Sequence, residues 1–320
     1  MNRVDNIKVV AFGGGTGLPV LLRGLRDRVG DLTAVVAVTD DGGSSGRLRQ
    51  ELGVAPPGDV RNCLVALAGR RRLAEVFNYR FEAPGDLNDH SVGNIIIAAL
   101  ADMAGGFSEG VEQAARFLRI KGRVLPAATE SLTLVVRYAD GTLTRGESVV
   151  HKVGKQVSEV SVEPAGIPAP RGVIEAIQSA DVLVLSPGSL FTSTIPALLG
   201  GGVREALADF GGPVIYAANA MTQQGETGDF TVSDHMRAIA EHVGPVVTDV
   251  LVHSGDLPPD ILARYEAEEA APVAVDREVL RGMGLRVREK DLLSKESHSG
   301  VRHDPAILAR EVCEAALVRL

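Results

Sequence analysis

The chain contains few of the aromatic residues, and lacks the excess of basic residues, that are typical of proteins that bind nucleic acid. Its 320 residues include no tryptophan and only 4% aromatic residues, so it has few rings that could stack on the bases of single-stranded nucleic acid. Its formal charge of −8 also argues against a general binder of nucleic acid, because such proteins carry a basic face that neutralises phosphates. We therefore expect no nucleic acid partner.

Cysteines and long apolar runs are scarce as well. The two cysteines, Cys63 and Cys313, lie far apart and fit no metal-ligand spacing, so we expect two buried, reduced thiols. The N-terminal stretch "MNRVDNIKVV" has no apolar signal core, and no segment reaches the roughly 18 uninterrupted apolar residues of a membrane span. These features predict a cytoplasmic protein without a membrane span.

The apolar residues that are present predict an α/β protein with a parallel sheet flanked by helices. Continuous apolar runs, typical of buried parallel strands, occupy residues 7–12, 32–38, 181–186, 213–219 and 248–254. Segments with helical periodicity, such as "VGNIIIAALADMA" and "EGVEQAARFLRI", lie between them. We expect one domain that spans residues 1–320.

Two segments differ from this alternation. The stretch "LTLVVRYADGTLTRGESVV" alternates apolar and polar residues around a turn at 139–141, which indicates an antiparallel hairpin with one wet face. We predict a small β-rich insertion over about residues 123–170. The C-terminal stretch "DPAILAREVCEAALVRL" predicts an amphipathic helix with Asp304 as its N-cap and Pro305 at its first position.

The first predicted strand leads directly into a glycine-rich loop, "GGGTGL", and then into a helix. The backbone N–H groups of such a loop, with the positive end of the following helix, can bind a phosphate. The loop lacks the third glycine of G-x-G-x-x-G, because Leu18 stands there, and it lacks the G-K-[ST] of a P-loop. A tight strand-to-helix turn and a phosphate or ribose site are both open interpretations.

The second predicted strand ends in "TDDGGSSGRL", residues 39–48, at the edge of the sheet where open α/β folds bind ligands. Asp40 and Asp41 suit a ribose hydroxyl or, together with Asp59, a magnesium ion. The glycines would let a loop close over a ligand, and the serines and arginine of the stretch are donors for phosphate. A polar surface loop is the alternative interpretation.

Four more polar stretches follow predicted strands or begin predicted helices. They are "PPGDVRNCLVAL", "LNDHSVGNIII", "SPGSLFTSTIP" and "NAMTQQGETGDFTVSDHMRAI". Within them, Asp59 could simply be an N-cap and His90 a structural histidine, and Ser233 is predicted to cap a helix. Because the carboxyl ends of parallel strands meet at one edge of a sheet, the five polar stretches together predict one shared site.

In this combination and order, the motifs resemble the YvcK/CofD-like family, specifically its gluconeogenesis factor branch. The resemblance covers nearly the whole chain and rests on "GGGTGL", "DDGGSSGRLR", "PPGDVRNCLVAL", "HSVGN", "SPGSLFTS", "NAMTQQGET", "TVSDH" and "VRHD". It implies a modified Rossmann-like fold and a cytoplasmic regulatory protein that binds a UDP-sugar, UDP-N-acetylglucosamine. It also implies a role in growth on gluconeogenic carbon sources, in normal cell shape and in the supply of cell-wall precursors.

The resemblance also implies roles for individual residues. Residues 13–18 would contact the nucleotide, Asp40 with Asp41 its ribose or a metal, and Arg302 its diphosphate, although a surface position for Arg302 is an equally open interpretation. One departure is Asp89, which stands before the histidine where the family pattern has glycine. The candidate metal ligands are Asp41 and Asp59, and no catalytic residue is assigned. The complete candidate ligand-binding set is Gly13, Gly14, Gly15, Thr16, Gly17, Leu18, Thr39, Asp40, Asp41, Gly42, Ser44, Arg47, Asp59, Asn62, His90, Asn94, Gly188, Ser189, Thr192, Asn219, Met221, Thr222, Gln223 and Arg302.

Three hypotheses follow. The first is a sensor that binds a UDP-sugar and acts through a protein partner or through its own state as a homo-oligomer. The second is a magnesium-dependent transferase of the 2-phospho-lactate transferase type that acts on a nucleotide diphosphate donor, with His90 or Asp234 near the acceptor. The third, an NAD-dependent oxidoreductase, is disfavoured by the missing glycine. Magnesium is the candidate cofactor.

Overall fold

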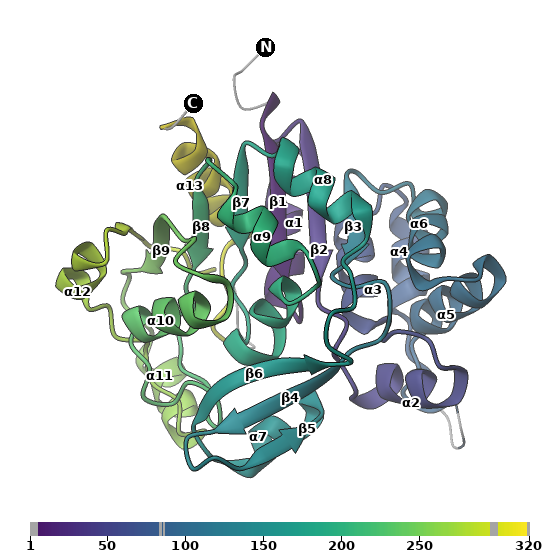
Figure 1. The fold of residues 1–320 in the computed structure, drawn as a ribbon, viewed down its shortest axis with the longest axis horizontal. Helices are drawn as coiled ribbons and strands as arrows, with labels where there is room; N and C mark the ends of the chain where they lie inside the picture. Colours follow the sequence, from purple (N-terminus) through teal and green to yellow (C-terminus); the bar gives the residue numbers. More distant parts are fainter. Residues whose placement is uncertain (1–5, 83–84, 86, 295–299, 319–320) are drawn as a thin grey trace.

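The structure is a computed structural model that describes residues 6–82, 85, 87–294 and 300–318. Its main feature is a seven-stranded parallel sheet with the strand order β10-β9-β8-β7-β1-β2-β3 (Figure 1). The strands are β1 (Lys8–Gly13), β2 (Asp31–Val36), β3 (Arg123–Pro126), β7 (Val182–Leu185), β8 (Val214–Ala217), β9 (Asp249–His253) and β10 (Arg286–Lys290). The predicted α/β class and all five predicted strands are confirmed.

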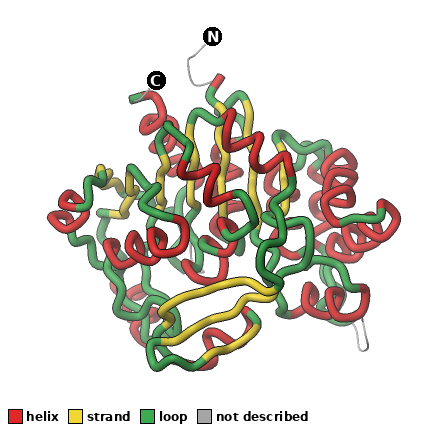
Figure 2. Tube along the Cα trace, in the orientation of Figure 1, coloured by secondary structure: helices red, strands yellow, loops and turns green. Residues whose placement is uncertain are grey.

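Helices cover both faces of this sheet (Figure 2). The α-helices of the described residues, which include α7 beside the small sheet of the insertion, are α1 (Gly17–Leu25), α2 (Gly43–Leu52), α3 (Gly58–Leu67), α4 (Arg71–Asn78), α5 (Val92–Ala104), α6 (Phe107–Leu118), α7 (Val150–Val153), α8 (Arg171–Ser179), α9 (Val203–Ala208), α10 (Val232–Val243), α11 (Pro259–Ala267), α12 (Arg277–Gly282) and α13 (Pro305–Leu317). Side chains alternate along β1: Val9 and Ala11 pack toward α1 and α13, whereas Val10 and Phe12 pack toward α8 and α9. Because helices bury both faces of the sheet, side chains on both faces of each strand are apolar, which explains the continuous apolar runs in the sequence.

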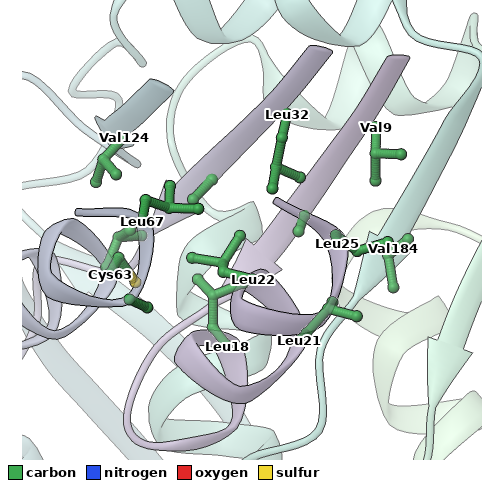
Figure 3. Close-up of a cluster of buried hydrophobic side chains, with 14 of the residues drawn as sticks. Val9, Leu18, Leu21, Leu22, Leu25, Leu32, Cys63, Leu67, Val124 and Val184 are labelled. Carbon is green, nitrogen blue, oxygen red and sulfur yellow. The ribbon is translucent and has the colours of Figure 1, made fainter. Parts of the chain in front are cut away.

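Helix α1 shows how one face is packed (Figure 3). Leu18, Leu21, Leu22 and Leu25 recur at helical spacing and are fully buried against the sheet. Burying each such side chain stabilises the fold by roughly 1.5–3 kcal/mol. Cys63 lies in the same cluster, and both cysteines are free and buried, as predicted.

The β-rich insertion forms a separate antiparallel sheet in the order β5-β4-β6, built from β4 (Thr133–Tyr138), β5 (Leu143–Arg145) and β6 (Val157–Glu163). The predicted hairpin is the β4–β5 pair. The predicted start of the insertion is wrong, because residues 123–126 are β3 and pair in parallel with β2. In Figure 1 the small sheet lies beyond the carboxyl ends of the main strands.

Two local predictions also need correction. Most of the stretch "TDDGGSSGRL" is not a loop, because α2 begins at Gly43. The N-cap of α10 is Thr231, not Ser233: Thr231 and Asp234 form a capping box, which satisfies two backbone N–H groups at once. This leaves Asp234 in a structural role.

The ends of the chain agree with the predictions where they are described. Asp304 caps α13 by accepting hydrogen bonds from two backbone N–H groups, as expected. Residues 1–5, on which part of the signal-peptide prediction rests, and residues 319–320 lie outside the described residues. Within the described part of the chain, none of the helices is long and apolar enough to cross a membrane.

Candidate functional site

The site lies at the boundary between β1 and β7, where the order in which strands are added to the sheet changes direction. From β1 the chain proceeds to β2 and β3 on one side, and β7 to β10 are added on the other side. Open α/β sheets bind ligands at such a switch point, in the crevice outside the carboxyl ends of the two central strands. The crevice here is bordered by the glycine-rich loop after β1 and by residues 186–189 after β7.

The glycine-rich loop is pressed closely against the loop after β7. A β-carbon at Gly17 would overlap the carbonyl oxygen of Pro187, so only glycine allows the N-terminus of α1 to approach that backbone. Gly15 has φ +57°, a left-handed conformation that costs other residues about 1–2 kcal/mol. The side chain of Leu18 is in the core, so it contributes only backbone atoms to any site here.

Asp59, in the first turn of α3, ties α3 to the glycine-rich loop. Its carboxylate accepts a hydrogen bond of 2.6 Å from the backbone N–H of Gly15. Burial, with a smaller contribution from the negative charge of Asp40, raises the pKa of Asp59 to about 6, while the Gly15 hydrogen bond opposes the shift. The N-cap of α3 is Pro57, so the N-cap interpretation of Asp59 is wrong.

The two aspartates after β2 point in different directions. Asp40 accepts from the backbone N–H of Gly42 at 2.9 Å, and its charge affects Asp59. Asp41 instead accepts from the backbone N–H of Ser148 in the insertion, at 2.8 Å. The predicted metal pair of Asp41 and Asp59 thus contacts two separate backbone segments.

Glu147, also from the insertion, joins this acidic cluster. It accepts a hydrogen bond of 3.1 Å from the hydroxyl of the buried Thr39. Burial and the charges of Asp59 and Asp40 raise the pKa of Glu147 well above its ordinary value. In the part of the chain that the structure describes, no three histidine, cysteine, aspartate or glutamate side chains form a metal-binding group. The magnesium site therefore stays a prediction.

His90 is the centre of a buried network that fixes α2 against the start of α5. Its Nδ1 lies 3.1 Å from the Ser44 hydroxyl, and its Nε2 accepts a hydrogen bond of 3.0 Å from Arg47 Nε. Asn94 also donates to Ser44, at 3.1 Å. Burial and then the charge of Arg47 lower the pKa of His90, so the ring is neutral. Both ring nitrogens are engaged, which supports the structural interpretation of His90.

The loops after β7 and β8 are joined by side-chain hydrogen bonds. The side-chain amide of Asn219 makes two hydrogen bonds with the backbone of Gly188. Its Oδ1 accepts from the N–H of Gly188 at 2.8 Å, and its Nδ2 donates to the carbonyl of Gly188 at 2.7 Å. The hydroxyl of Ser189 donates to Glu226 at 2.5 Å, and Thr192 donates to Ser189 at 2.6 Å. These bonds hold the start of the short helix Leu190–Thr194 in the wall of the crevice.

A cavity of about 210 Å³ opens in this crevice. It is lined by Thr16, Gly17, Val20, Pro187, Gly188, Asn219, Ala220, Met221, Thr222, Gln223, Tyr265, Val301, Arg302 and His303. Eight of the predicted ligand-binding residues are in that wall. The others lie elsewhere in the same region. Gly13, Gly14 and Gly15 belong to the glycine-rich loop and Leu18 to α1, whereas Ser189 and Thr192 lie beside the loop after β7. Thr39, Asp40 and Asp59 belong to the acidic cluster, with Asp41 and Gly42 next to it, and Ser44, Arg47, His90 and Asn94 form the His90 network. Asn62 accepts a hydrogen bond from Arg61.

The cavity has a positive rim. Arg302 and the N-terminus of α1 both line it, and the first turn of α1 carries no acidic residue. Burial and then the charge of Arg302 lower the pKa of Arg23, which stands on α1 one turn beyond the cavity-lining Val20. A helix N-terminus and an arginine that line one space are groups that can bind an anion.

Sequence reasoning missed several residues of the site, and three of them, Tyr265, His303 and Glu147, have polar side chains that can contact a ligand. Tyr265 lies in α11 and forms part of the cavity wall, but no motif surrounds it in the sequence. His303 was visible only as a neighbour of Arg302 in "VRHD". Glu147 reaches the acidic cluster from the insertion, and only the tertiary fold brings it there.

Comparisons with known proteins agree with this architecture. The sequence model of one family, described as 2-phospho-L-lactate transferase CofD, matches residues 9–293. The gluconeogenesis factor of Halalkalibacterium halodurans is 43% identical over 308 residues, which covers 96% of this chain and 95% of that protein. The gluconeogenesis factor of Bacillus subtilis is 42% identical over 299 residues, 93% of this chain and 94% of that protein. A crystal structure of a UPF0052 family member from Bacillus halodurans is 42% identical and superimposes with a TM-score of 0.93, covering 96% of this chain and 99% of that one.

Proposed function

Because the chain belongs to the CofD family and is similar over nearly its whole length to bacterial gluconeogenesis factors, we propose that it is a regulatory protein that binds a UDP-sugar. The ligand is UDP-N-acetylglucosamine, bound in the cavity between α1 and the loops after β7 and β8. The observation that carries this proposal is that one cavity gathers residues from four separate motifs: the glycine-rich loop, "SPGSLFTS", "NAMTQQGET" and "VRHD".

The electrostatics of the cavity suit a diphosphate. The N-terminus of α1 provides backbone N–H groups and a partial positive charge, and Arg302, which lines the same cavity, provides a full positive charge. The two hydrogen bonds between Asn219 and Gly188 connect the loop after β8 to the loop after β7 and hold both in place without a ligand. A cavity that is organised in advance loses less entropy on binding.

A regulatory role fits the chemistry of the side chains. The one histidine among the predicted site residues, His90, has both ring nitrogens engaged by Ser44 and Arg47, so it is not poised as a general base. The binding protein would act in the cytoplasm, through a protein partner or its own oligomeric state. Its cellular role would be to support growth on gluconeogenic carbon sources, normal cell shape and the supply of cell-wall precursors.

A second candidate function is supported by the acidic cluster. Asp40 and Asp59 interact electrostatically, and Glu147 stands beside them at the end of β2. Carboxylates are the ligands that magnesium prefers, and bound magnesium would neutralise charge on a nucleotide diphosphate donor. The alternative is therefore a magnesium-dependent transferase of the CofD type, in which Asp40 and Asp59 would serve as metal ligands.

One experiment separates the two functions. The purified protein is titrated with UDP-N-acetylglucosamine in a calorimeter, with and without magnesium, and the mixture is then analysed by chromatography. Saturable binding with the ligand recovered intact supports the regulatory protein. Release of UDP or UMP that requires magnesium and is lost in Asp59→Asn supports the magnesium-dependent enzyme instead, with water taking the place of the acceptor. Absence of binding under both conditions overturns the proposal.

A further inference from the structure

One end of the molecule carries a strong positive charge that none of the roles assigned above uses. It is formed by three segments at the amino ends of β2 and β3: residues 26–28 after α1, residues 69–72 between α3 and the first turn of α4, and residues 119–123 after α6. These twelve residues include eight arginines or lysines and one aspartate, a formal charge of +7, whereas the whole chain carries −8. We call the surface that they form the basic end.

Hydrogen bonds hold the three segments side by side. The backbone N–H of Gly69 donates to the carbonyl of Arg119 at 3.1 Å, and the backbone N–H of Lys121 donates to the carbonyl of Leu67 at 2.9 Å. The guanidinium of Arg26 donates to a carbonyl near the end of α3, at 2.9 Å. The basic side chains therefore belong to one surface rather than to three unrelated turns.

Structural roles account for only part of this charge. Arg26 and Arg70 donate to carbonyl groups at the C-terminal ends of α3 and α6, where a positive charge also complements the helix dipole. Ion pairs engage three more of the basic residues: Lys121 with Asp27, Arg71 with Glu75 and Arg123 with Asp31. Three exposed arginines have no ion-pair partner among the described residues: Arg28, Arg72 and Arg119. With all three of these carboxylates counted, the basic end keeps five positive charges.

The arrangement of the charges indicates an extended anionic partner. A small anion is bound by donors that converge in a concave site. The charges of the basic end instead stand in turns and at helix ends, and the cavity described above takes none of its walls from them. Basic residues that are spread over a surface are attracted by a layer of anionic lipid headgroups, and guanidinium groups suit the geometry of phosphate.

Two observations favour a membrane over other large anionic partners. The remaining 308 residues carry a formal charge of −15, so a nucleic acid that extended beyond the basic end would be repelled by the rest of the surface. A bilayer touches only one end of the molecule, and salt screens charges that lie more than about 8–10 Å away. A stable interface with a protein has an apolar core, but Ile120, the one apolar residue of the three segments, packs against the interior.

We propose that the basic end is a peripheral binding site for an anionic membrane surface, whose lipid phosphates its arginine and lysine side chains contact. Binding is electrostatic, reversible and weakened by salt. The cavity between α1 and the loops after β7 and β8 lies at the carboxyl ends of the strands, so it stays open to solvent in the bound molecule (Figure 1). This inference goes beyond the proposed function and does not depend on it.

The test measures sedimentation of the wild-type protein with lipid vesicles, without nucleotide. One set of vesicles contains phosphatidylcholine alone, and the other also contains phosphatidylglycerol as about 30% of its lipid. We expect at least fivefold more protein to sediment with the anionic vesicles in about 50 mM sodium chloride, and this excess to disappear in about 500 mM. This arm requires no mutation, so it does not depend on whether a variant folds.

A double variant assigns the binding to the basic end. Arg71→Glu combined with Arg72→Glu reverses two charges in the first turn of α4, where acidic residues suit the helix dipole. The side chain of Arg71 is 95% exposed, so we expect the variant to fold, and thermal melts check this. Sedimentation with the anionic vesicles should fall at least fivefold.

The matched control is Arg171→Glu combined with Arg204→Glu, which changes the net charge by the same amount outside the basic end. Arg171 is the first residue of α8 and pairs with the glutamate four positions later, as Arg71 does in α4. Arg204 is exposed in the first turn of α9. This control should sediment with anionic vesicles within twofold of the wild type.

The outcomes separate the membrane from its alternatives. Equal sedimentation of the wild type with both kinds of vesicle, or equal losses in the two double variants, overturns the proposal. Tighter binding to single-stranded polyuridylate than to the anionic vesicles also overturns it, because the basic end would then be a nucleic acid site. None of these results bears on the binding of UDP-N-acetylglucosamine, which calorimetry tests separately.

Discussion

The backbone N–H of Gly15 donates a hydrogen bond of 2.6 Å to the carboxylate of Asp59, 44 positions later in the chain. One amide of the glycine-rich loop is therefore already bound to an anion, and that anion belongs to the protein. The loop displays the chemistry expected of an anion-binding loop, but this amide serves to fix α3 beneath it. Diphosphate binding would depend on the remaining N–H groups at the start of α1 and on Arg302.

Replacing Asp59 by asparagine should change how stability depends on pH. Burial raises the pKa of Asp59 from 3.8 to about 6, so the unfolded chain releases the proton at lower pH than the folded chain does. Stability therefore falls by up to about 3 kcal/mol as pH rises between about 4 and 6. Asp59→Asn should remove this decline, making the variant more stable than the wild type at pH 7.5 and similar to it at pH 4.

Denaturant titrations across this pH range measure the effect. Asp102→Asn, at an exposed position on α5, is the control and should leave the pH profile unchanged. If the free energy of unfolding of the wild type and of Asp59→Asn changed with pH in the same way, ionisation of the Asp59 carboxylate would not destabilise the folded protein, and the prediction would be wrong.

Gly17→Ala should damage both folding and binding. The new β-carbon would overlap the carbonyl oxygen of Pro187, so the loop after β7 must move away from α1. We expect a loss of about 1–3 kcal/mol in the free energy of unfolding and a UDP-sugar affinity reduced more than tenfold. Gly228→Ala is the control, because a β-carbon there meets no atom within 4 Å. Equal melting temperatures for the two variants would contradict the close approach.

Arg302→Ala should weaken binding of the diphosphate. A hydrogen bond to a charged group contributes about 1.5–3 kcal/mol, which corresponds to roughly a ten- to 150-fold loss in affinity for UDP-N-acetylglucosamine. The variant should melt like the wild type because the side chain is exposed. Arg71→Ala, an exposed arginine on α4, serves as the control. Unaltered affinity in calorimetry would return Arg302 to the solvated surface.

His90→Ala should destabilise the fold by about 1–3 kcal/mol, because it leaves Ser44 and Arg47 with unsatisfied groups. Burial lowers the pKa of His90, so the unfolded chain binds a proton at higher pH than the folded chain. Wild-type stability should therefore fall as pH drops below about 6.5, and this component should vanish in the variant. Chemical denaturation at pH 5.5 and 7.5 measures it. A variant as stable as the wild type at pH 7.5 would show that the network is dispensable.

Periodicity and caps were enough to predict the regular parts of the fold. Helix α5 spans the predicted residues because Ser91 caps its start and Gly105, with φ +73°, ends it. The glycine-rich start of α2 resembled a loop, yet Gly46 is needed for packing against the carbonyl of Asp41. Strand β3 was misassigned because it has only four residues and directly precedes the insertion.

The candidate site was predictable to the extent that its residues lie in motifs. The cavity walls from Thr16, Asn219 and Arg302 were visible because each stands at the end of a predicted strand or before a capped helix. Tyr265 and Glu147 were not, because long-range packing alone brings them to the site. Which residues from distant segments meet at the edge of the sheet is decided by the order of the strands and by the packing of the insertion, and local sequence patterns do not contain this information.

The first cavity takes one wall from residues 16–20 and another from residues 301–303. Nearly three hundred residues separate these walls, and they meet because α13 packs on α1, where Gly24 lies directly against the backbone of Pro305. A polypeptide emerging from the ribosome cannot possess this cavity until α13 has been made and has docked on α1. A ligand in the cavity would in turn stabilise the docked position of α13, because it binds only the arrangement in which both walls are present.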